Sequence, residues 1–115
     1  MDLEKVKSKL KEFSDERDWD QFHSPKNLAM ALSVEVAELV EIFQWANDGG
    51  AKEIKDPAIR KQIEEEIADI FNYLIKFVDL LDLDLEKISL EKIKKNAEKY
   101  PIKKSKGKAE KYNKI

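Results

Sequence analysis

Residues 24–45 read Ser-Pro-Lys-Asn-Leu-Ala-Met-Ala-Leu-Ser-Val-Glu-Val-Ala-Glu-Leu-Val-Glu-Ile-Phe-Gln-Trp, and this stretch decides the fold. It predicts a helix, because Ser24 is a favourable N-cap and Pro25 follows at the first helical position, where its missing N–H is not needed. The segment is apolar on nearly every side, so we expect the helix to be buried. Its only charged residues after position 26 are Glu35, Glu38 and Glu41.

The first two of these glutamates predict a site that carries positive charge. Glu35 and Glu38 are three residues apart, so their side chains leave the helix from neighbouring points on one face. A buried carboxylate is unfavourable unless it is paired, neutralised or bound to a metal. A solvated face or a bridge to a lysine remains the alternative at this point.

The composition predicts one all-α domain. The chain has 115 residues, of which 40% are charged and 42% hydrophobic, with only 3 Gly and 3 Pro. The abundance of Lys, Glu, Leu and Ile favours helix over sheet. The absence of Cys and the single His argue against thiolate and His-rich metal sites, so any metal is expected to be bound by oxygen.

Neither a membrane nor a nucleic acid is the expected partner. No apolar run is long enough to span a bilayer and the N-terminus lacks a signal-peptide pattern, so we expect a cytoplasmic protein. The last fifteen residues contain six lysines and one glutamate, a net charge of +5. Such a tail could hold phosphates, but we interpret it as solvated. We therefore assign residues 1–101 to the domain and 102–115 to a basic, mobile tail.

The hydrophobic spacing predicts four main helices. An amphipathic helix spans residues 2–16, followed by the aromatic connection 17–23 and the central helix. Asp56 and Pro57 repeat the cap-then-proline signal and begin a long third helix. Asp84 caps a fourth, which Pro101 should terminate.

The third helix carries a second carboxylate pair. Glu66 and Asp69 repeat the three-residue spacing beside apolar positions. If the two long helices run antiparallel, four carboxylates can face one another in a cluster that is stable only with divalent cations. Oxygen ligands of this kind favour Mg²⁺, with Mn²⁺ as a substitute. Carboxylate-bound Mg²⁺ usually completes its shell with water and substrate phosphates, so the pattern predicts a phosphorylated ligand.

Aromatic and basic residues outside the carboxylate pairs can then be interpreted as ligand contacts. Four residues could stack on or select a base: Trp19, Phe22, His23 and Trp45. Lys92 and Asn96, one helical turn apart, could hold phosphate oxygens. Taken singly, the aromatics are also consistent with a core, His23 with a loop hydrogen bond and Lys92 with a surface charge.

These motifs carry a resemblance to a known family. The segments Arg17-Asp-Trp-Asp-Gln-Phe-His-Ser-Pro-Lys-Asn-Leu28, Glu35-Val-Ala-Glu-Leu-Val-Glu-Ile-Phe-Gln-Trp45 and Glu66-Ile-Ala-Asp69, with Tyr73, Lys92, Asn96 and Tyr100-Pro101, resemble the MazG-like all-α nucleotide pyrophosphohydrolases. The likeness covers roughly residues 8–101 and is greatest to the dCTP pyrophosphatase branch. Leu10 departs from it, because it stands where relatives in that branch carry a histidine, and this leaves the base preference open.

The resemblance implies Mg²⁺-dependent hydrolysis of a nucleoside triphosphate, such as dCTP or a modified pyrimidine analogue, to the monophosphate and pyrophosphate. It implies metal ligation by Glu35, Glu38, Glu66 and Asp69, base contacts from Trp19, Phe22, His23 and Trp45, and phosphate or sugar contacts from Tyr73, Lys92 and Asn96. Glu38 and Glu41, one turn apart, are our candidates for catalysis, with Glu41 orienting the attacking water or supporting the site through a salt bridge. Rival interpretations are a related pyrophosphohydrolase acting on phosphoribosyl-ATP and a non-enzymatic helical interaction module.

The same pattern predicts an oligomer. The two long helices are apolar over more of their circumference than a chain of 115 residues can easily cover, so we expect a dimer or a dimer of dimers. A helix from residue 25 to about 46 would also separate its flanking aromatics by about 30 Å. Trp19 and Trp45 could then serve one pocket only if the loop folds back along the helix or a second subunit contributes one of them.

Overall fold

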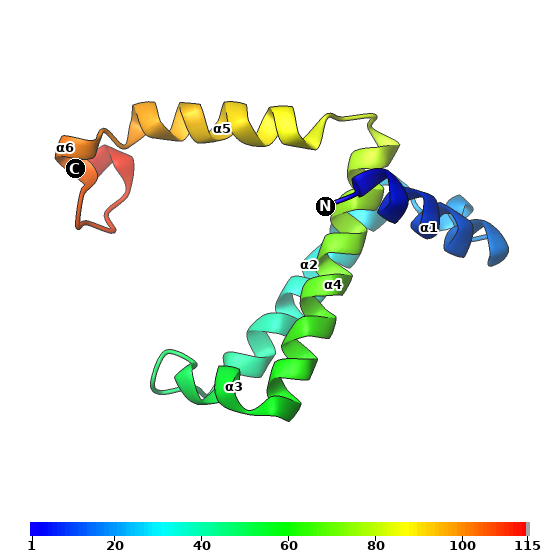
Figure 1. Ribbon diagram of the computed structural model, residues 1–115, viewed down its shortest axis with the longest axis horizontal. Helices are drawn as coiled ribbons and strands as arrows, with labels where there is room; N and C mark the ends of the chain where they lie inside the picture. The colour runs from blue at the N-terminus through cyan, green and yellow to red at the C-terminus, as the bar shows by residue number, and fades with distance from the viewer. Residues whose placement is uncertain (115) are drawn as a thin grey trace. The chain divides into compact units, whose positions relative to one another are not determined.

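The computed structural model describes residues 1–114 and confirms an all-α chain, because no strand occurs within those residues (Figure 1). No helix in this part of the chain is long and apolar enough to cross a membrane. The elements in chain order are α1 (Leu3–Glu16), the 3₁₀ turn η1 (Asp20–Phe22), α2 (Pro25–Phe43), α3 (Ala51–Lys55), α4 (Pro57–Leu80), α5 (Leu85–Lys99), α6 (Ile102–Ser105) and the 3₁₀ turn η2 (Tyr112–Lys114).

The predicted capping residues begin the long helices. Ser24 accepts a hydrogen bond from the Asn27 N–H at 3.2 Å, and Asp56 accepts one from the Ala58 N–H at 2.9 Å. Each cap is followed by proline at the first helical position. These bonds satisfy N–H groups that have no partner inside a helix, and they fix where α2 and α4 begin.

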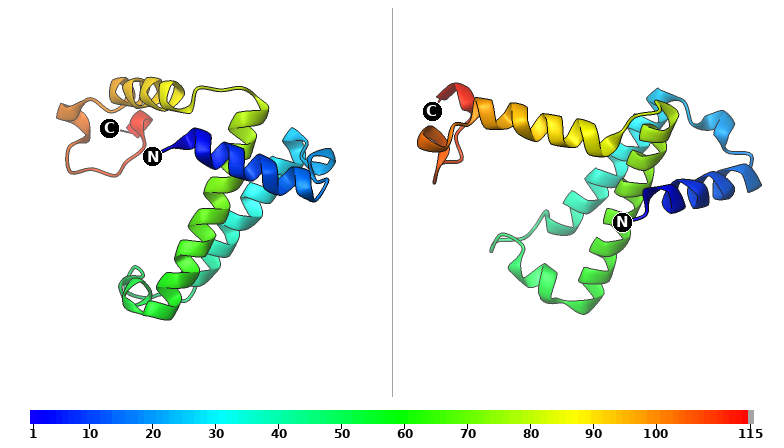
Figure 2. Two further views of the ribbon diagram at one scale, coloured as in Figure 1. Left: turned by 45° about the vertical axis from the view of Figure 1, so that its right-hand side comes forward. Right: turned by 45° about the horizontal axis from the view of Figure 1, so that its top comes forward.

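The chain forms two compact units, Met1–Leu81 and Asp82–Ile115. In the first unit α4 packs against α1, α2 and α3, and α2 runs antiparallel beside α4 (Figures 1 and 2). The antiparallel arrangement brings Leu28, near the start of α2, to the same end of the pair as Ile75 and Val78, near the end of α4. These three apolar side chains are the buried core of the described chain.

The expectation that α2 is buried is wrong for the single chain. Leu28 is the only residue of this helix that is fully buried, while Met30, Val34, Val36 and Val40 are between 42% and 60% exposed. The reason is geometric, because α4 covers one side of α2 and the other elements of this unit do not enclose the rest. An apolar face of this kind remains open along the helix.

The connection between α2 and α4 contains a short helix that the four predicted helices do not include. Residues 51–55 form this helix, α3. Gly50 begins it with φ at +93°, and a Cβ there would lie 2.8 Å from the ring of Phe43. Glycine is therefore required by both the backbone and the ring. The helix α2 ends at Phe43, so Trp45 lies beyond it.

The second unit contains α5, α6 and η2. As expected, α5 begins after the Asp84 cap and ends before Pro101, at Lys99. In the basic tail the Tyr112 ring packs edge-on against Tyr100, with the ring centroids 6.1 Å apart. The domain boundary at residue 101 and the mobility of the tail stay predictions.

Candidate metal centre and substrate pocket

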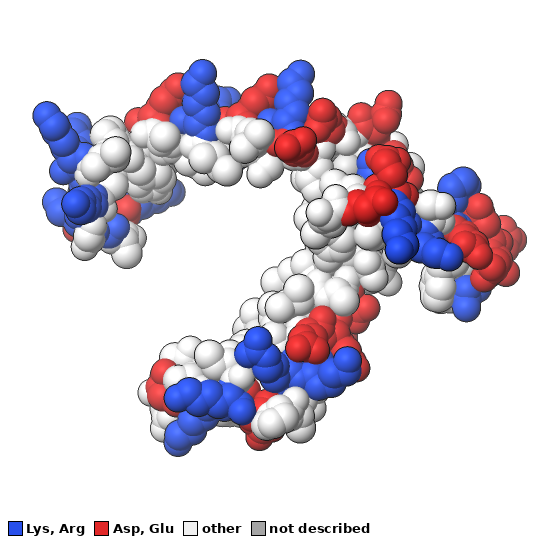
Figure 3. Space-filling model, viewed as in Figure 1, with Lys and Arg blue, Asp and Glu red and all other residues white. Residues whose placement is uncertain are grey.

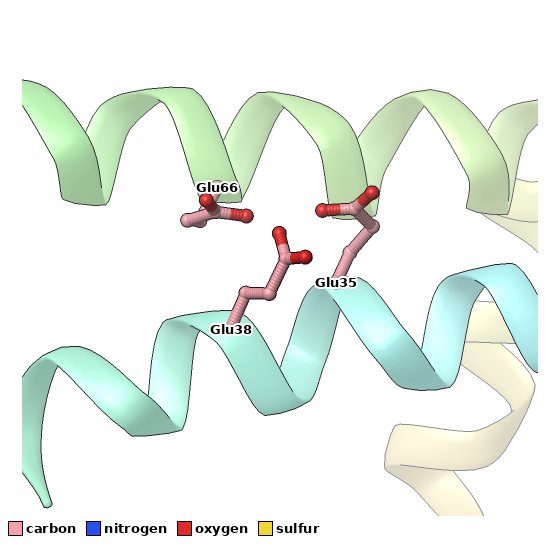
Figure 4. A group of neighbouring side chains, drawn as sticks. All are labelled: Glu35, Glu38 and Glu66. Carbon is pink, nitrogen blue, oxygen red and sulfur yellow. The ribbon is translucent and has the colours of Figure 1, made fainter.

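Three glutamates converge between the two long helices. Glu35 and Glu38 project from α2 and Glu66 projects from α4, and their carboxylate groups point toward one another (Figure 4). One oxygen from each lies within 4.8 Å of the other two. Glu64 and Glu65, the two glutamates that precede Glu66 on α4, are exposed. The helical spacing therefore selects Glu66 for this cluster.

The pKa of both Glu35 and Glu66 is raised in this cluster. Burial, together with the neighbouring Glu38 and Glu66 and the charge of Asp69, raises the pKa of Glu35 to about 7. Burial also raises the pKa of Glu66 above its ordinary value. Withdrawal from water and proximity of like charge both disfavour the ionised form. No ion pair within residues 1–114 brings a positive charge to these three glutamates.

The cluster fits a divalent cation. Oε2 of Glu35 and Oε2 of Glu66 are buried and have no hydrogen-bond partner, and no ion pair among residues 1–114 involves either glutamate. Buried polar atoms nearly always have a partner, so these oxygens mark a place for a ligand. Carboxylate oxygens alone are the donors typical of Mg²⁺ and Mn²⁺. Glu35, Glu38 and Glu66 could hold such an ion.

Two predicted site carboxylates lie outside this group of three. Asp69 follows Glu66 by one turn of α4, and its charge raises the pKa of both Glu35 and Glu66. It also lines a neighbouring pocket, so it stands between the cluster and that pocket. Glu41 is exposed near the end of α2.

A pocket of about 300 Å³ adjoins Asp69 and contains three more of the predicted site residues. Trp19 and His23 reach it from the connection between α1 and α2, and Tyr73 reaches it from α4. Burial and the positive charge of Lys76 lower the pKa of His23, which keeps the imidazole neutral. Its Nδ1 is buried without a hydrogen-bond partner, so this nitrogen is available to a ligand.

Phe22 and Trp45, two other predicted base contacts, are placed differently. Phe22 is exposed and does not line the pocket, although it belongs to the same connection. Trp45 is 87% exposed, because it follows the last residue of α2. Neither ring is buried by this chain.

Lys92 and Asn96 are exposed on α5. They belong to the second unit, whereas the glutamate cluster and the pocket belong to the first. Their proposed contact with phosphate stays a prediction.

Sequence reasoning missed five pocket residues, namely Leu10, Phe13, Ser14, Asn72 and Lys76. Leu10 was considered only as a departure from relatives. The periodicity of α4 contains the signal for two of them. Asp69, Asn72, Tyr73 and Lys76 follow one another at helical spacing, so they lie on one face. Lys76 also forms an ion pair with Asp20, at 3.2 Å from Nζ to Oδ1.

Comparison with known proteins connects this geometry to a family. The family model of the MazG-like family matches residues 30–115. Rat dCTP pyrophosphatase 1 is 39% identical over 111 residues, which cover 96% of this chain and 65% of the rat protein. The human dCTP pyrophosphatase 1 is 37% identical over 114 residues, 98% of this chain and 67% of the human protein. The chain thus spans about two thirds of the length of these relatives.

A solved structure has the same fold. A pyrophosphatase from Archaeoglobus fulgidus superposes with a TM-score of 0.80 at 39% sequence identity. The match covers 88% of this chain and 94% of the archaeal chain.

Proposed function

Because the chain belongs to the MazG-like family, we propose that it is a divalent-metal-dependent nucleotide pyrophosphohydrolase. Its reaction is hydrolysis of a nucleoside triphosphate between the α- and β-phosphates, which releases the monophosphate and pyrophosphate. The names of the relatives, dCTP pyrophosphatases, support this activity, and so does the name of the archaeal structure, a pyrophosphatase.

One observation carries the proposal. Glu35, Glu38 and Glu66 hold their carboxylates within 4.8 Å of one another, and two of their buried oxygens have no partner. A helical interaction module has no need for such an arrangement, because unpaired buried carboxylates destabilise a fold. In a phosphohydrolase the same arrangement is the means of holding a cation against a triphosphate.

We propose Mg²⁺ as the ion, with Mn²⁺ as a substitute, and Asp69 as the fourth carboxylate ligand. When bound, Mg²⁺ supplies neutralisation of the triphosphate charge and Lewis-acid activation of the attacking water. Glu38 and Glu41, one turn apart on α2, are the candidates for orienting that water. Glu35, Glu66 and Asp69 would hold the ion in place against the phosphates, and positioning of this kind is where much of the catalysis of phosphoryl-group chemistry lies.

The pocket beside Asp69 is proposed to receive the base and sugar. Its volume of about 300 Å³ lies at the lower end of the range for small-molecule sites. Trp19 offers an aromatic surface for stacking and neutral His23 a hydrogen-bonding nitrogen. The names of the relatives favour dCTP or a modified pyrimidine analogue as the substrate. Tyr73 is proposed to contact the sugar, and Lys92 and Asn96 the phosphates.

We further propose that the active form is a homodimer or a dimer of dimers. The apolar side chains along α2, with exposed fractions of 42–60% in this chain, support this assembly. In the space-filling view, uncharged side chains cover much of the middle of the α2–α4 pair, whereas charged side chains gather toward α3 (Figure 3). A second copy would bury this surface, and it could bring the exposed Trp45 to the pocket of its partner.

A nucleotide panel tests the proposal. The protein is incubated with each canonical and several modified deoxynucleoside triphosphates and with phosphoribosyl-ATP, and pyrophosphate is detected with Mg²⁺ or with a chelator. We expect Mg²⁺-dependent release that is fastest with a cytosine-type deoxynucleotide. No release from any compound would contradict the activity, and fastest release from phosphoribosyl-ATP would contradict the substrate. Melting in parallel should show stabilisation by Mg²⁺ that matched ionic strength does not reproduce.

A further inference from the structure

The carboxylate of Asp20 attaches the connection between α1 and α2 to two helices, α1 and α4. Asp20 Oδ1 accepts a hydrogen bond from Ser14 Oγ on α1 at 2.6 Å. The same oxygen accepts a second bond, from Lys76 Nζ on α4 at 3.2 Å. These bonds lower the pKa of Asp20 to about 2, with Ser14 as the largest cause, so the carboxylate is ionised. A short O–H···O⁻ bond is among the stronger hydrogen bonds in proteins.

Ser14 is unusually placed for a hydroxyl side chain. It is 1% exposed, and it is the one buried polar residue among residues 1–114. Its carbonyl also accepts the backbone N–H of Trp19 at 3.0 Å. Loss of the Asp20 carboxylate would leave the buried hydroxyl without its partner, which is more costly than the loss of a bond exposed to water. The hydrogen bond from Ser14 therefore holds the connection in one position against α1, although the Asp20 side chain itself is half exposed.

The residues held by Asp20 are the ones that form the pocket. Trp19 precedes it in the chain, and His23 donates its backbone N–H to the Asp20 carbonyl at 3.1 Å. The Trp19 ring packs edge-on against Phe13 of α1, with the centroids 5.6 Å apart. Figure 2 shows this connection, residues 17–24, turning back from the end of α1 to the start of α2. Asp20 thus connects the pocket wall to two helices at once.

We propose that Asp20 is a positioning residue, which holds Trp19 and His23 in the binding-competent arrangement through its contacts with Ser14 and Lys76. The inference rests on the proposed function for its kinetic consequence. Asp20 would thereby preorganise the pocket for the base and sugar of the nucleotide. When the competent arrangement is only partly populated, apparent affinity falls in proportion to that population, while the bound complex still reacts.

The test compares Asp20→Ala, Asp20→Asn and Ser14→Ala with Asp18→Asn as the matched control. Asp18 lies in the same connection, but among residues 1–114 its side chain accepts a bond only from Gln21, so it links the connection to neither α1 nor α4. Its φ of 53° also suits asparagine. Steady-state hydrolysis of dCTP gives KM and kcat, and circular dichroism and melting confirm that each variant is folded.

We expect Asp20→Ala to raise KM about tenfold with kcat changed less than about threefold, as expected for loss of a preorganised state. Asp20→Asn, which can still accept both hydrogen bonds, should give an intermediate KM. Ser14→Ala should raise KM as well. The double variant Ser14→Ala/Asp20→Ala should have the KM of Asp20→Ala, since both substitutions break the same hydrogen bond between Ser14 and Asp20. The control should keep the unchanged protein's KM.

A second measurement needs no substrate turnover. In a Trp45→Phe background Trp19 is the single tryptophan, so acrylamide quenching reports its accessibility. We expect Asp20→Ala to increase the quenching constant about twofold by freeing the ring from the rigid arrangement, and Asp18→Asn to leave it unchanged. Unchanged quenching, or a KM for Asp20→Ala within about twofold of the unchanged protein, overturns the proposal. If the unchanged protein hydrolyses no nucleotide, the proposed function fails, and the quenching alone decides whether Asp20 holds the connection.

Discussion

Glu35 on α2 and Glu66 on α4 place carboxylate oxygens within 4.8 Å of each other, and Oε2 of each residue is buried without a hydrogen-bond partner. The two residues belong to different helices, so the approach is produced by the antiparallel packing of α2 on α4 (Figure 4). Like charges at this spacing oppose ionisation in the absence of a cation.

The first prediction concerns the stability of the metal-free protein. The pKa of Glu35 is about 7 in the folded chain against an ordinary value of 4.5. Between these two values the folded state therefore keeps a proton that the unfolded state releases. The contribution of this proton to the free energy of unfolding is fully present below pH 4.5 and is lost as pH rises through about 7. With a chelator present, the melting temperature should fall between about pH 5.5 and pH 8.

Two comparisons check the cause of that pH dependence. In Glu35→Gln the dependence should flatten, because the amide does not titrate. Excess Mg²⁺ should restore stability most strongly above pH 7, since the metal binds the ionised carboxylates. The same pH dependence in Glu35→Gln as in the unchanged protein would show that the carboxylates are not held close together in solution.

The second prediction concerns turnover. Glu35→Gln, Glu38→Gln, Glu66→Gln and Asp69→Asn should each reduce kcat by about 10² or more, because loss of a correctly placed cation removes several kcal/mol of transition-state stabilisation. Glu65→Gln is the matched control, since Glu65 adjoins Glu66 but is exposed. Steady-state pyrophosphate release measures the effect. Near-normal activity in all four variants, or an equal loss in the control, would contradict the assignment of these four carboxylates as metal ligands.

The third prediction concerns assembly. Light scattering at micromolar concentration should give at least twice the chain mass of 13.4 kDa. Val40→Glu should shift the particle toward the monomer, because it places a charge on an apolar side chain that is 60% exposed in the single chain. Ser8→Glu, an exposed position on α1, serves as the control. A monodisperse monomer for the unchanged protein would contradict the dimer.

The fourth prediction concerns a shared pocket. Trp45→Ala should raise KM far more than it lowers the free energy of unfolding, because the ring is 87% exposed and contributes little to the core of its own chain. The Trp45→Ala protein, assayed at dCTP concentrations too low for it to work, and the inactive Glu38→Gln protein should regain part of the activity when mixed and allowed to form heterodimers, because one site then combines Glu38 of one chain with Trp45 of the other. Failure of this complementation in oligomers shown to be mixed would mean that each pocket is built by one chain.

Much of the fold was predictable because its signals are local. The Ser24 and Asp56 caps and the prolines after them identify where the long helices begin, and side-chain spacing selects Glu66 rather than Glu64 or Glu65 for the cluster. These features depend on periodicity and capping, which are read along the chain. The helix α3 was missed, because five residues beside a glycine turn have too little periodicity to indicate a helix.

The site was less predictable wherever contacts join distant residues. The pairing of Asp20 with Lys76 spans 56 positions and has no local signal. The exposure of α2 was also missed, since an apolar sequence indicates that a surface is covered but does not say by which chain. Lys92 and Asn96 were grouped with the site from sequence, and their side chains lie in the second unit.

The central claim is that the glutamate cluster holds a divalent cation for cleavage between the α- and β-phosphates. Its most direct test is ³¹P NMR of the products of dCTP with Mg²⁺, compared with the same reaction containing excess chelator. We predict equal amounts of dCMP and pyrophosphate with Mg²⁺ and no reaction with the chelator. Formation of dCDP and inorganic phosphate, or undiminished hydrolysis with the chelator, would contradict the account.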